Sequence, residues 1–184
     1  METSVNQNKI VLKWTIISVI TSIVITYIFQ FTNVDQSSGI KYISSIPFIV
    51  YLFLAQKEYK DQLGGYISFG KAFSTGFKYS IFTGLILAVF TYLYFAILSP
   101  QVYDKIMTDA QQKLTDQGQL SSEQIDSAME ITRKYGVIFT TVGIVIFDAF
   151  IGAILALIGA AIFKNERPLF ITESDDPTVN DPTV

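Results

Sequence analysis

Four long runs of apolar residues constrain this chain more than any other feature. They cover residues 14–31, about 39–55, 79–98 and 136–163, and the longest holds one charge, Asp148. The hydrocarbon core of a bilayer is about 30 Å thick, and a helix needs roughly 20 apolar residues to cross it. Backbone polar groups in lipid must pair within their own segment, so each run is expected to form a helix. The pattern predicts an all-α integral membrane protein with four transmembrane helices. The predicted spans are about 14–32, 39–55, 73–98 and 136–163.

The second run is the least certain to cross the membrane, because it is short and contains Pro47. Its uncharged part, residues 42–55, also suits a re-entrant or interfacial segment. We favour a spanning helix, since Lys41 can extend its ammonium group to the interface and neighbouring helices tolerate a proline. The first run could be a signal peptide, but no A-x-A-like cleavage site follows it, so we expect a retained anchor.

Charges that flank the runs predict the orientation. If both ends of the chain are cytoplasmic, eight cations lie inside and five outside, as the positive-inside rule requires. The inner set is Lys9, Lys13, Lys57, Lys60, Lys71, Lys78, Lys164 and Arg167, and the outer set is Lys41, Lys105, Lys113, Arg133 and Lys134. Residues 1–13 then form a cytoplasmic N-terminus, and residues 166–184 form an acidic cytoplasmic tail whose composition predicts disorder.

Two segments between the runs have helical patterns of their own. Aromatic residues at helical spacing precede the third span and predict an amphipathic lead-in at the cytoplasmic interface. They are Tyr66, Phe69, Phe73 and Phe77. Residues 101–135 carry two weaker apolar stripes separated by a turn that contains Gly118, with Ser121 or Ser122 as a cap for the second helix. This pattern predicts an extracytoplasmic helical hairpin between the third and fourth spans.

Composition excludes several classes of function. The chain has no Cys and no His, so thiolate sites, histidine metal ligands and histidine bases are all excluded. A net charge of -3 gives no electrostatic case for nucleic acid. Residues 65–71 match the start of a phosphate-binding loop, but Ala72 stands where a magnesium-binding hydroxyl is required. We expect no cofactor, no metal, no nucleotide and no catalytic residue.

Asp148 is the candidate intramembrane polar site. A carboxylate at the centre of a spanning helix costs roughly 2.5 to 3.5 kcal/mol to insert, so such residues face the protein interior and often have a function. Three small residues follow Asp148 at intervals of four and predict a helix-packing face. They are Gly152, Ala156 and Ala160. No Lys or Arg within the predicted spans could pair with the carboxylate, since Lys78 lies at the cytoplasmic edge of the third span. The candidate partners are therefore hydroxyls, those of Thr21, Thr83, Thr91 and Thr141.

Three segments resemble the bacterial membrane family known as domain of unknown function 4199. They read GYISFGKAF at 65–73, YLYFAILSP at 92–100 and IGAILALIGAAIFK at 151–164. The resemblance covers about residues 9–165 and implies a small four-helix protein of the bacterial inner membrane with no assigned activity. It carries over no catalytic residue and gives Asp148 no role.

Three functions fit these observations. We favour a non-enzymatic membrane component that works by helix–helix association, as an accessory subunit or homo-oligomer, because of the small-residue face. The alternative is a small proton- or ion-coupled transporter or channel that uses Asp148. A lipid-modifying enzyme is the least favoured, since the chain lacks His, Cys and a cluster of intramembrane acids. The expected partners are therefore the lipid bilayer and a second membrane protein.

Overall fold

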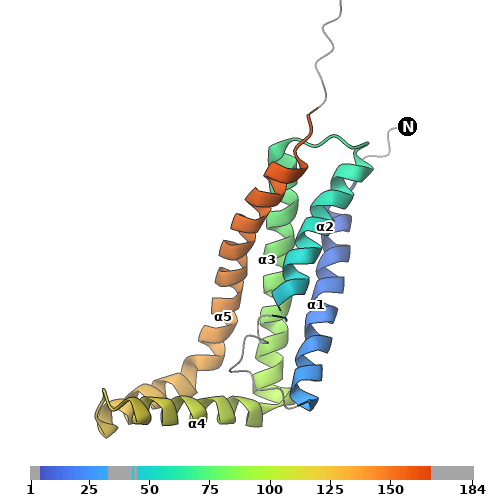
Figure 1. Cartoon of the computed structure of the whole chain (residues 1–184). Helices are drawn as coiled ribbons and strands as arrows, with labels where there is room; N and C mark the ends of the chain where they lie inside the picture. The colour runs from blue at the N-terminus through green and yellow to red at the C-terminus, as the bar shows by residue number, and fades with distance from the viewer. Residues whose placement is uncertain (1–4, 33–42, 44, 167–184) are drawn as a thin grey trace, which may run out of the picture.

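A computed structural model describes residues 5–32, 43 and 45–166, and within these ranges every regular element is helical (Figure 1). The elements are α1 (Gln7–Phe31), α2 (Ile46–Gln62), α3 (Phe69–Leu93), the π-helical turn η2 (Tyr94–Leu98), α4 (Pro100–Gln117) and α5 (Ser122–Phe163). Three of the described helices are long and apolar enough to cross a membrane. They are Gln7–Phe29, Phe69–Leu98 and Ser122–Phe163.

Contacts between side chains fix the helix directions. Gln7 Nε2 donates to Thr75 Oγ1 (2.8 Å) near the starts of α1 and α3, and Tyr27 meets Tyr94 edge to face near their ends, so these helices run parallel. Glu58 on α2 binds Lys13 and accepts from Trp14 Nε1 (2.6 Å), so α2 runs antiparallel to α1. We call the end of the bundle where α1 and α3 begin and α2 and α5 finish the terminal end (top of Figure 1).

The terminal end is closed by a short link between the α2–α3 turn and the end of α5. Gly64 and Gly65 adopt φ of 78° and 86°, which only glycine does at low cost, and so turn the chain into α3. Ile67 then pairs with Asn165 through two backbone hydrogen bonds, and Asn165 Nδ2 donates to the carbonyl of Gly65 (2.9 Å). Gly65, the first glycine of the phosphate-loop-like segment, therefore forms part of a turn, and Gly70, its second glycine, lies in α3.

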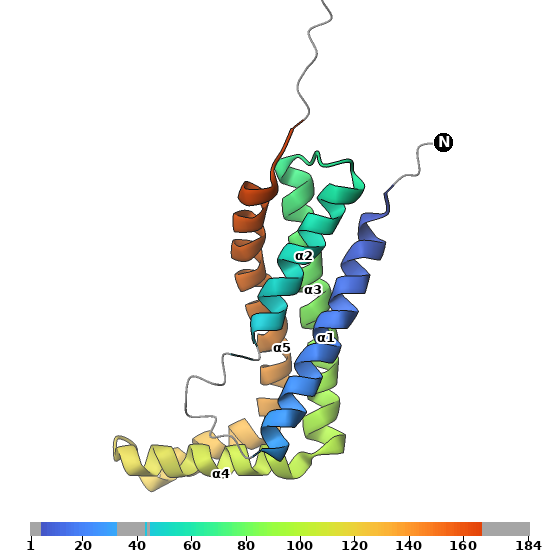
Figure 2. The same cartoon turned by 45° about the vertical axis from the view of Figure 1, so that its right-hand side comes forward.

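The second helix differs from the sequence prediction in its bounds. It covers 46–62 rather than 39–55, and of the predicted span residues 39–42 and 44 lie outside the described part of the chain. Pro47 occupies its first turn, where a missing N–H costs nothing, so no kink is needed. Figures 1 and 2 show α2 beside only the half of the bundle nearest the terminal end.

The fifth helix also differs, because the predicted hairpin arm and the predicted fourth span form one continuous helix of 42 residues. At 1.5 Å per residue it is about 63 Å long, twice the thickness of a hydrocarbon core. Its first turns run beside α4 across the end of the bundle opposite the terminal end (Figure 1). Met107, Ile125 and Met129 form a small buried cluster between these two segments.

Local signals in the sequence set the ends of α4 and α5. Gly118 ends α4 in a left-handed conformation at φ 62°. Ser121 rather than Ser122 caps α5, and it forms a capping box with Gln124.

Tyr103 marks the place where α5 turns away from α4. Its hydroxyl donates to the carbonyl of Thr132 (2.8 Å), and a Cβ built on Gly136 would lie 2.3 Å from that hydroxyl. A side chain that reaches into the helical hydrogen-bond ladder bends a helix. A tyrosine hydroxyl is protonated at neutral pH, and burial raises the pKa of Tyr103 further, so the hydroxyl remains a donor.

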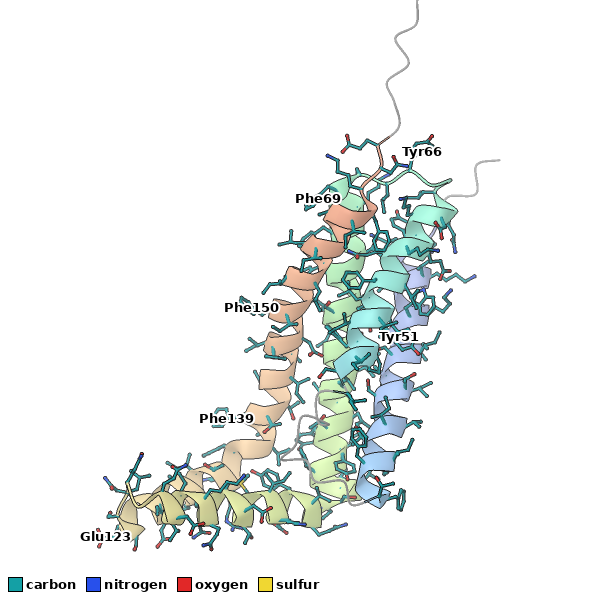
Figure 3. The ribbon with its side chains drawn as sticks, in the orientation of Figure 1. Tyr51, Tyr66, Phe69, Glu123, Phe139 and Phe150 are labelled. Atoms are coloured by element: carbon teal, nitrogen blue, oxygen red, sulfur yellow. The ribbon has the colours of Figure 1, made fainter. Side chains whose placement is uncertain are left out.

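From Phe69 on, the predicted lead-in forms the first part of α3, which continues into the third predicted span. Phe69 is the first residue of α3, and Thr75, which lies between the aromatic positions of the lead-in, is fully buried. The outward faces of the long helices are apolar: Phe139 and Phe150 on α5 are each 66% exposed and point away from the bundle (Figure 3). Such a surface is compatible with a lipid bilayer.

Candidate functional site

Helices α3 and α5 share the most extensive interface of the fold, and small residues line it on both sides. On α3 the positions are Gly76, Ser80 and Gly84, and on α5 they are Asp148, Gly152 and Ala156. A Cβ built on Gly152 would lie 2.0 Å from Ser80 Oγ, and one built on Gly76 would lie 2.8 Å from the Ala156 Cβ. Glycine is needed here because the two helices approach more closely than a side chain allows.

The predicted small-residue face of α5 is therefore buried within the chain. Gly152 faces Ser80 and Ala156 faces Gly76, as above, while Ala160 belongs to a cluster with Ile10, Tyr59, Ile67 and Ala72. Ala156 and Ala160 are fully buried. This face is occupied by α3 and by residues near the terminal end, so a second copy of the chain cannot use it without unpacking the bundle.

Asp148 lies on the same interface, one turn further from the terminal end than Gly152. It packs on Gly84, where a built Cβ would lie 3.1 Å from the Asp148 Cβ and 3.4 Å from Oδ2. The side chain is half-buried, and its Oδ2 atom is buried with no hydrogen-bond partner among the described residues. Glycine at position 84 thus provides the space in which the carboxylate lies.

Two of the four hydroxyls that the sequence offered for Asp148 donate to backbone carbonyls of their own helices. Thr21 donates to the carbonyl of Ile17, and Thr141 donates to the carbonyl of Val137. Lys78 binds Gln7 Oε1 (2.7 Å) at the terminal end. Thr83 is different, because it is fully buried and its hydroxyl has no partner in the described part of the chain.

A group of buried hydroxyls lies beside the carboxylate. Tyr79 on α3 is fully buried, and its hydroxyl lies near those of Ser18 on α1 and Thr83 on α3 and within electrostatic range of Asp148. None of the three hydroxyls completes a hydrogen bond of ordinary geometry with another described residue. Buried polar groups are usually paired, so a run of unpaired ones is a feature that needs a reason. We call Ser18, Tyr79, Thr83 and Asp148 the polar cluster.

Gln56 joins the helices on the terminal side of the polar cluster. It lies on α2, is fully buried, and donates from Nε2 to the carbonyls of Ala72 on α3 and Ala156 on α5, both at 3.0 Å. Two glycines make room for it, because a Cβ on Gly159 would lie 1.8 Å from Oε1 and a Cβ on Gly76 would lie 2.7 Å from Nε2. This contact ties the short helix α2 to both long neighbours.

Sequence reasoning identified Asp148 but missed Gln56, Ser18 and Tyr79. A signal for Tyr79 was present, since Thr75, Tyr79 and Thr83 recur every four residues and so share a face of α3. Gln56 gave none, because it follows the apolar run directly and reads as its polar boundary. Within the described ranges, no three acidic side chains gather into a group that could hold a metal ion.

Comparison with known proteins assigns the chain to a family. Residues 13–165 match the family described as "Protein of unknown function (DUF4199)", which is well over half of the chain, and the chain belongs to that family. No curated protein and no solved structure matches.

Proposed function

We propose that this member of the DUF4199 family crosses the bacterial inner membrane four times, with both ends in the cytoplasm. Support comes from the parallel directions of α1 and α3, since a chain that enters two parallel helices from the same side must return between them. Helix α2 runs in the returning direction. The α4–α5 hairpin then lies outside the cytoplasm.

The charge distribution among the described residues supports the same orientation. Seven cations lie at or near the terminal end, and four lie on α4 and the first turns of α5. The first group is Lys9, Lys13, Lys57, Lys60, Lys71, Lys78 and Lys164, and the second is Lys105, Lys113, Arg133 and Lys134. The positive-inside rule places the richer side in the cytoplasm.

Within this membrane protein, we propose that Asp148 binds and releases a proton or a small cation, as the site of a non-enzymatic transporter or channel. One observation carries the proposal. Oδ2 of Asp148 is buried at the interface between α3 and α5 and has no hydrogen-bond partner within the described chain, and the hydroxyls near it have none either. A buried carboxylate that no cation neutralises is expensive in a membrane, and proton and ion pathways are where such residues occur.

Association with another membrane protein is the second candidate function. The inward direction of the Gly152, Ala156 and Ala160 face removes the observation that first favoured it. The α4–α5 hairpin supplies a different one, because it projects sideways beyond the bundle and carries exposed apolar residues such as Leu120 and Ile131 (Figure 1). An accessory role would use this surface.

Proton and cation flux in proteoliposomes separates the two candidates. We expect the purified protein to carry flux and the Asp148→Asn variant to carry none, since an amide cannot exchange a proton or hold a cation by charge. Asp126→Asn, a matched change of an exposed carboxylate on the hairpin part of α5, should leave flux intact. Absence of flux in the native protein, or full flux in a folded Asp148→Asn variant, would reject transport at Asp148 and favour association.

A further inference from the structure

We infer that the terminal end of the bundle binds the phosphate headgroup of an anionic phospholipid at the junction of α1 and α3. The site consists of Gln7 and Asn8 on α1 and Lys71 and Lys78 on α3. We call these four residues the basic junction. The inference goes beyond the proposed role of Asp148 and does not depend on it, because it needs only a bundle that lies in a membrane.

Lys78 carries a positive charge that no acidic side chain of the described chain neutralises. The residue is half-buried, and its Nζ donates to Gln7 Oε1 (2.7 Å) and to Asn8 Oδ1 (3.3 Å). Amide oxygens accept hydrogen bonds but have no net charge, and a lysine ammonium has three hydrogens to donate. Because a partly desolvated cation is costly without an anion beside it, Lys78 is suited to bind one with its remaining donor.

Gln7 fixes the position of this ammonium group. Its Nε2 donates to Thr75 Oγ1 (2.8 Å) and to the carbonyl of Lys71 (3.4 Å), while its Oε1 accepts from Lys78. One amide therefore contacts α3 at three positions about a turn apart. These contacts restrict the Lys78 side chain before any ligand arrives, so less conformational entropy is lost when an anion binds.

The charges at the terminal end leave lysines in excess among the described residues. Each acidic side chain described there already forms a salt bridge with a lysine outside the basic junction. The pairs are Glu58 with Lys13, Asp61 with Lys57, and Glu166 with Lys164. Lys71 and Lys78 have no such partner in the described part of the chain. Their charge is therefore complementary to an anion supplied from outside it.

The basic junction continues into an apolar surface. Lys71 and Lys78 are seven residues apart and so share a face of α3. Phe82, Leu85 and Val89 extend this face along the helix, and their side chains are 38%, 47% and 61% exposed. A ligand that fits both parts has an anionic group followed by hydrocarbon, which describes a phospholipid rather than a soluble phosphate.

The depth of Lys78 also matches the level of lipid headgroups. Residues 79–98 contain no charged side chain, and at 1.5 Å per residue they span about 30 Å, the thickness of a hydrocarbon core. Beyond them, α4 begins at Pro100 and runs across the opposite end of the bundle (Figure 1). A core that ends at Leu98 therefore ends near Lys78 on the other side. Basic pockets between transmembrane helices are known binding sites for anionic headgroups.

Native mass spectrometry of the full-length protein in detergent tests the site. The protein is titrated with phosphatidylglycerol or with phosphatidylcholine that has the same acyl chains. We expect phosphatidylglycerol to bind more tightly. Lys78→Gln should weaken its binding about fivefold, since one lysine near an anionic surface contributes roughly 1 kcal/mol, and should leave phosphatidylcholine binding unchanged. Lys78→Arg keeps the charge and should keep the preference.

Two controls separate a built site from general attraction between charges. Lys60→Gln removes the same charge from α2 at the same end and should leave the preference intact. Excess glycerol phosphate should not displace the lipid, because it lacks acyl chains. Lys71→Gln, a change of an exposed side chain, carries the same expectation as Lys78→Gln if that variant does not fold.

Equal affinity for the two lipids would overturn the inference. Equal losses from Lys60→Gln and Lys78→Gln, or displacement of the lipid by glycerol phosphate, would overturn it as well. None of these results bears on flux at Asp148, so the two proposals fail separately.

Discussion

At the scale of single residues, Gly152 has the least room for a side chain on the α3–α5 seam. An added Cβ would lie 2.0 Å from Ser80 Oγ and 2.2 Å from Ser80 Cβ, far inside any van der Waals contact. Gly152→Ala must therefore push α3 and α5 apart. We expect the free energy of unfolding to fall by about 1–3 kcal/mol, the usual cost of overpacking a well-packed interior. Denaturant titration of the purified protein in detergent measures it.

Gly143 on the same helix provides the matched control. A Cβ there would meet nothing within 4 Å, so only the intrinsic helix preference changes. Gly143→Ala should raise the free energy of unfolding by about 0.5–1 kcal/mol, because alanine loses less entropy in a helix than glycine does. Equal effects from the two substitutions would mean that the close approach at Gly152 does not exist in the folded protein.

The sequence predicts the part of the candidate site that lies on α5, but not the residues of other helices that pack against it. The interval of four between Asp148 and Gly152 places both on one face, and insertion cost indicates that this face points inward. The helix that packs against this face is determined by the tertiary fold, and the pattern of one helix does not reveal it. Ser80, Gly84 and the hydroxyls of Ser18 and Tyr79 could not be assigned to Asp148, because nothing in one sequence links positions more than 60 residues apart.

At the scale of helices, the attachment of α2 depends on Gln56. We expect Gln56→Leu to remove both hydrogen bonds to Ala72 and Ala156 and to lower the free energy of unfolding by about 1–2 kcal/mol, given roughly 0.6 kcal/mol, and at most about 1.7, for each interhelical hydrogen bond in a membrane. The branched leucine also fits poorly against Gly159. Hydrogen exchange should show faster opening of α2 than of α3.

Gln62→Leu is the control for that experiment. Gln62 is an exposed glutamine of the same helix that donates only to Glu58 (2.9 Å) in the described structure. Its replacement should change stability by less than about 0.5 kcal/mol. If α2 exchanges at the native rate in Gln56→Leu, the helix is held by its apolar contacts and the buried amide is incidental to it.

Helix content is predictable from this sequence, but helix bounds are only partly so. Uncharged runs of about 20 residues allow only helices in lipid, so the long helices follow from composition and order along the chain. The continuous helix α5 was missed because its polar first half and apolar second half have different patterns, while no residue between them stops a helix. Helix α2 was placed too early because the apolar run was taken as the helix, whereas Lys57–Gln62 extends it in polar residues.

At the scale of the whole molecule, the two ends of the bundle are expected to face opposite sides of the membrane. Because the chain has no cysteine, single introduced cysteines can test this. Asp61 lies at the terminal end and Asp109 on α4, and both are exposed. A membrane-impermeant thiol reagent added to intact bacteria should label Asp109→Cys but not Asp61→Cys, and inverted membrane vesicles should reverse the result. The reason is that the positive-inside rule puts the terminal end, with the larger share of Lys, in the cytoplasm.

Labelling of both cysteines from the same side would contradict four crossings, because α1, α3 and α5 each join the level of Asp61 to that of Asp109. Reversed labelling would keep the four crossings and invert the orientation. In that case the α4–α5 hairpin would lie on the cytoplasmic side.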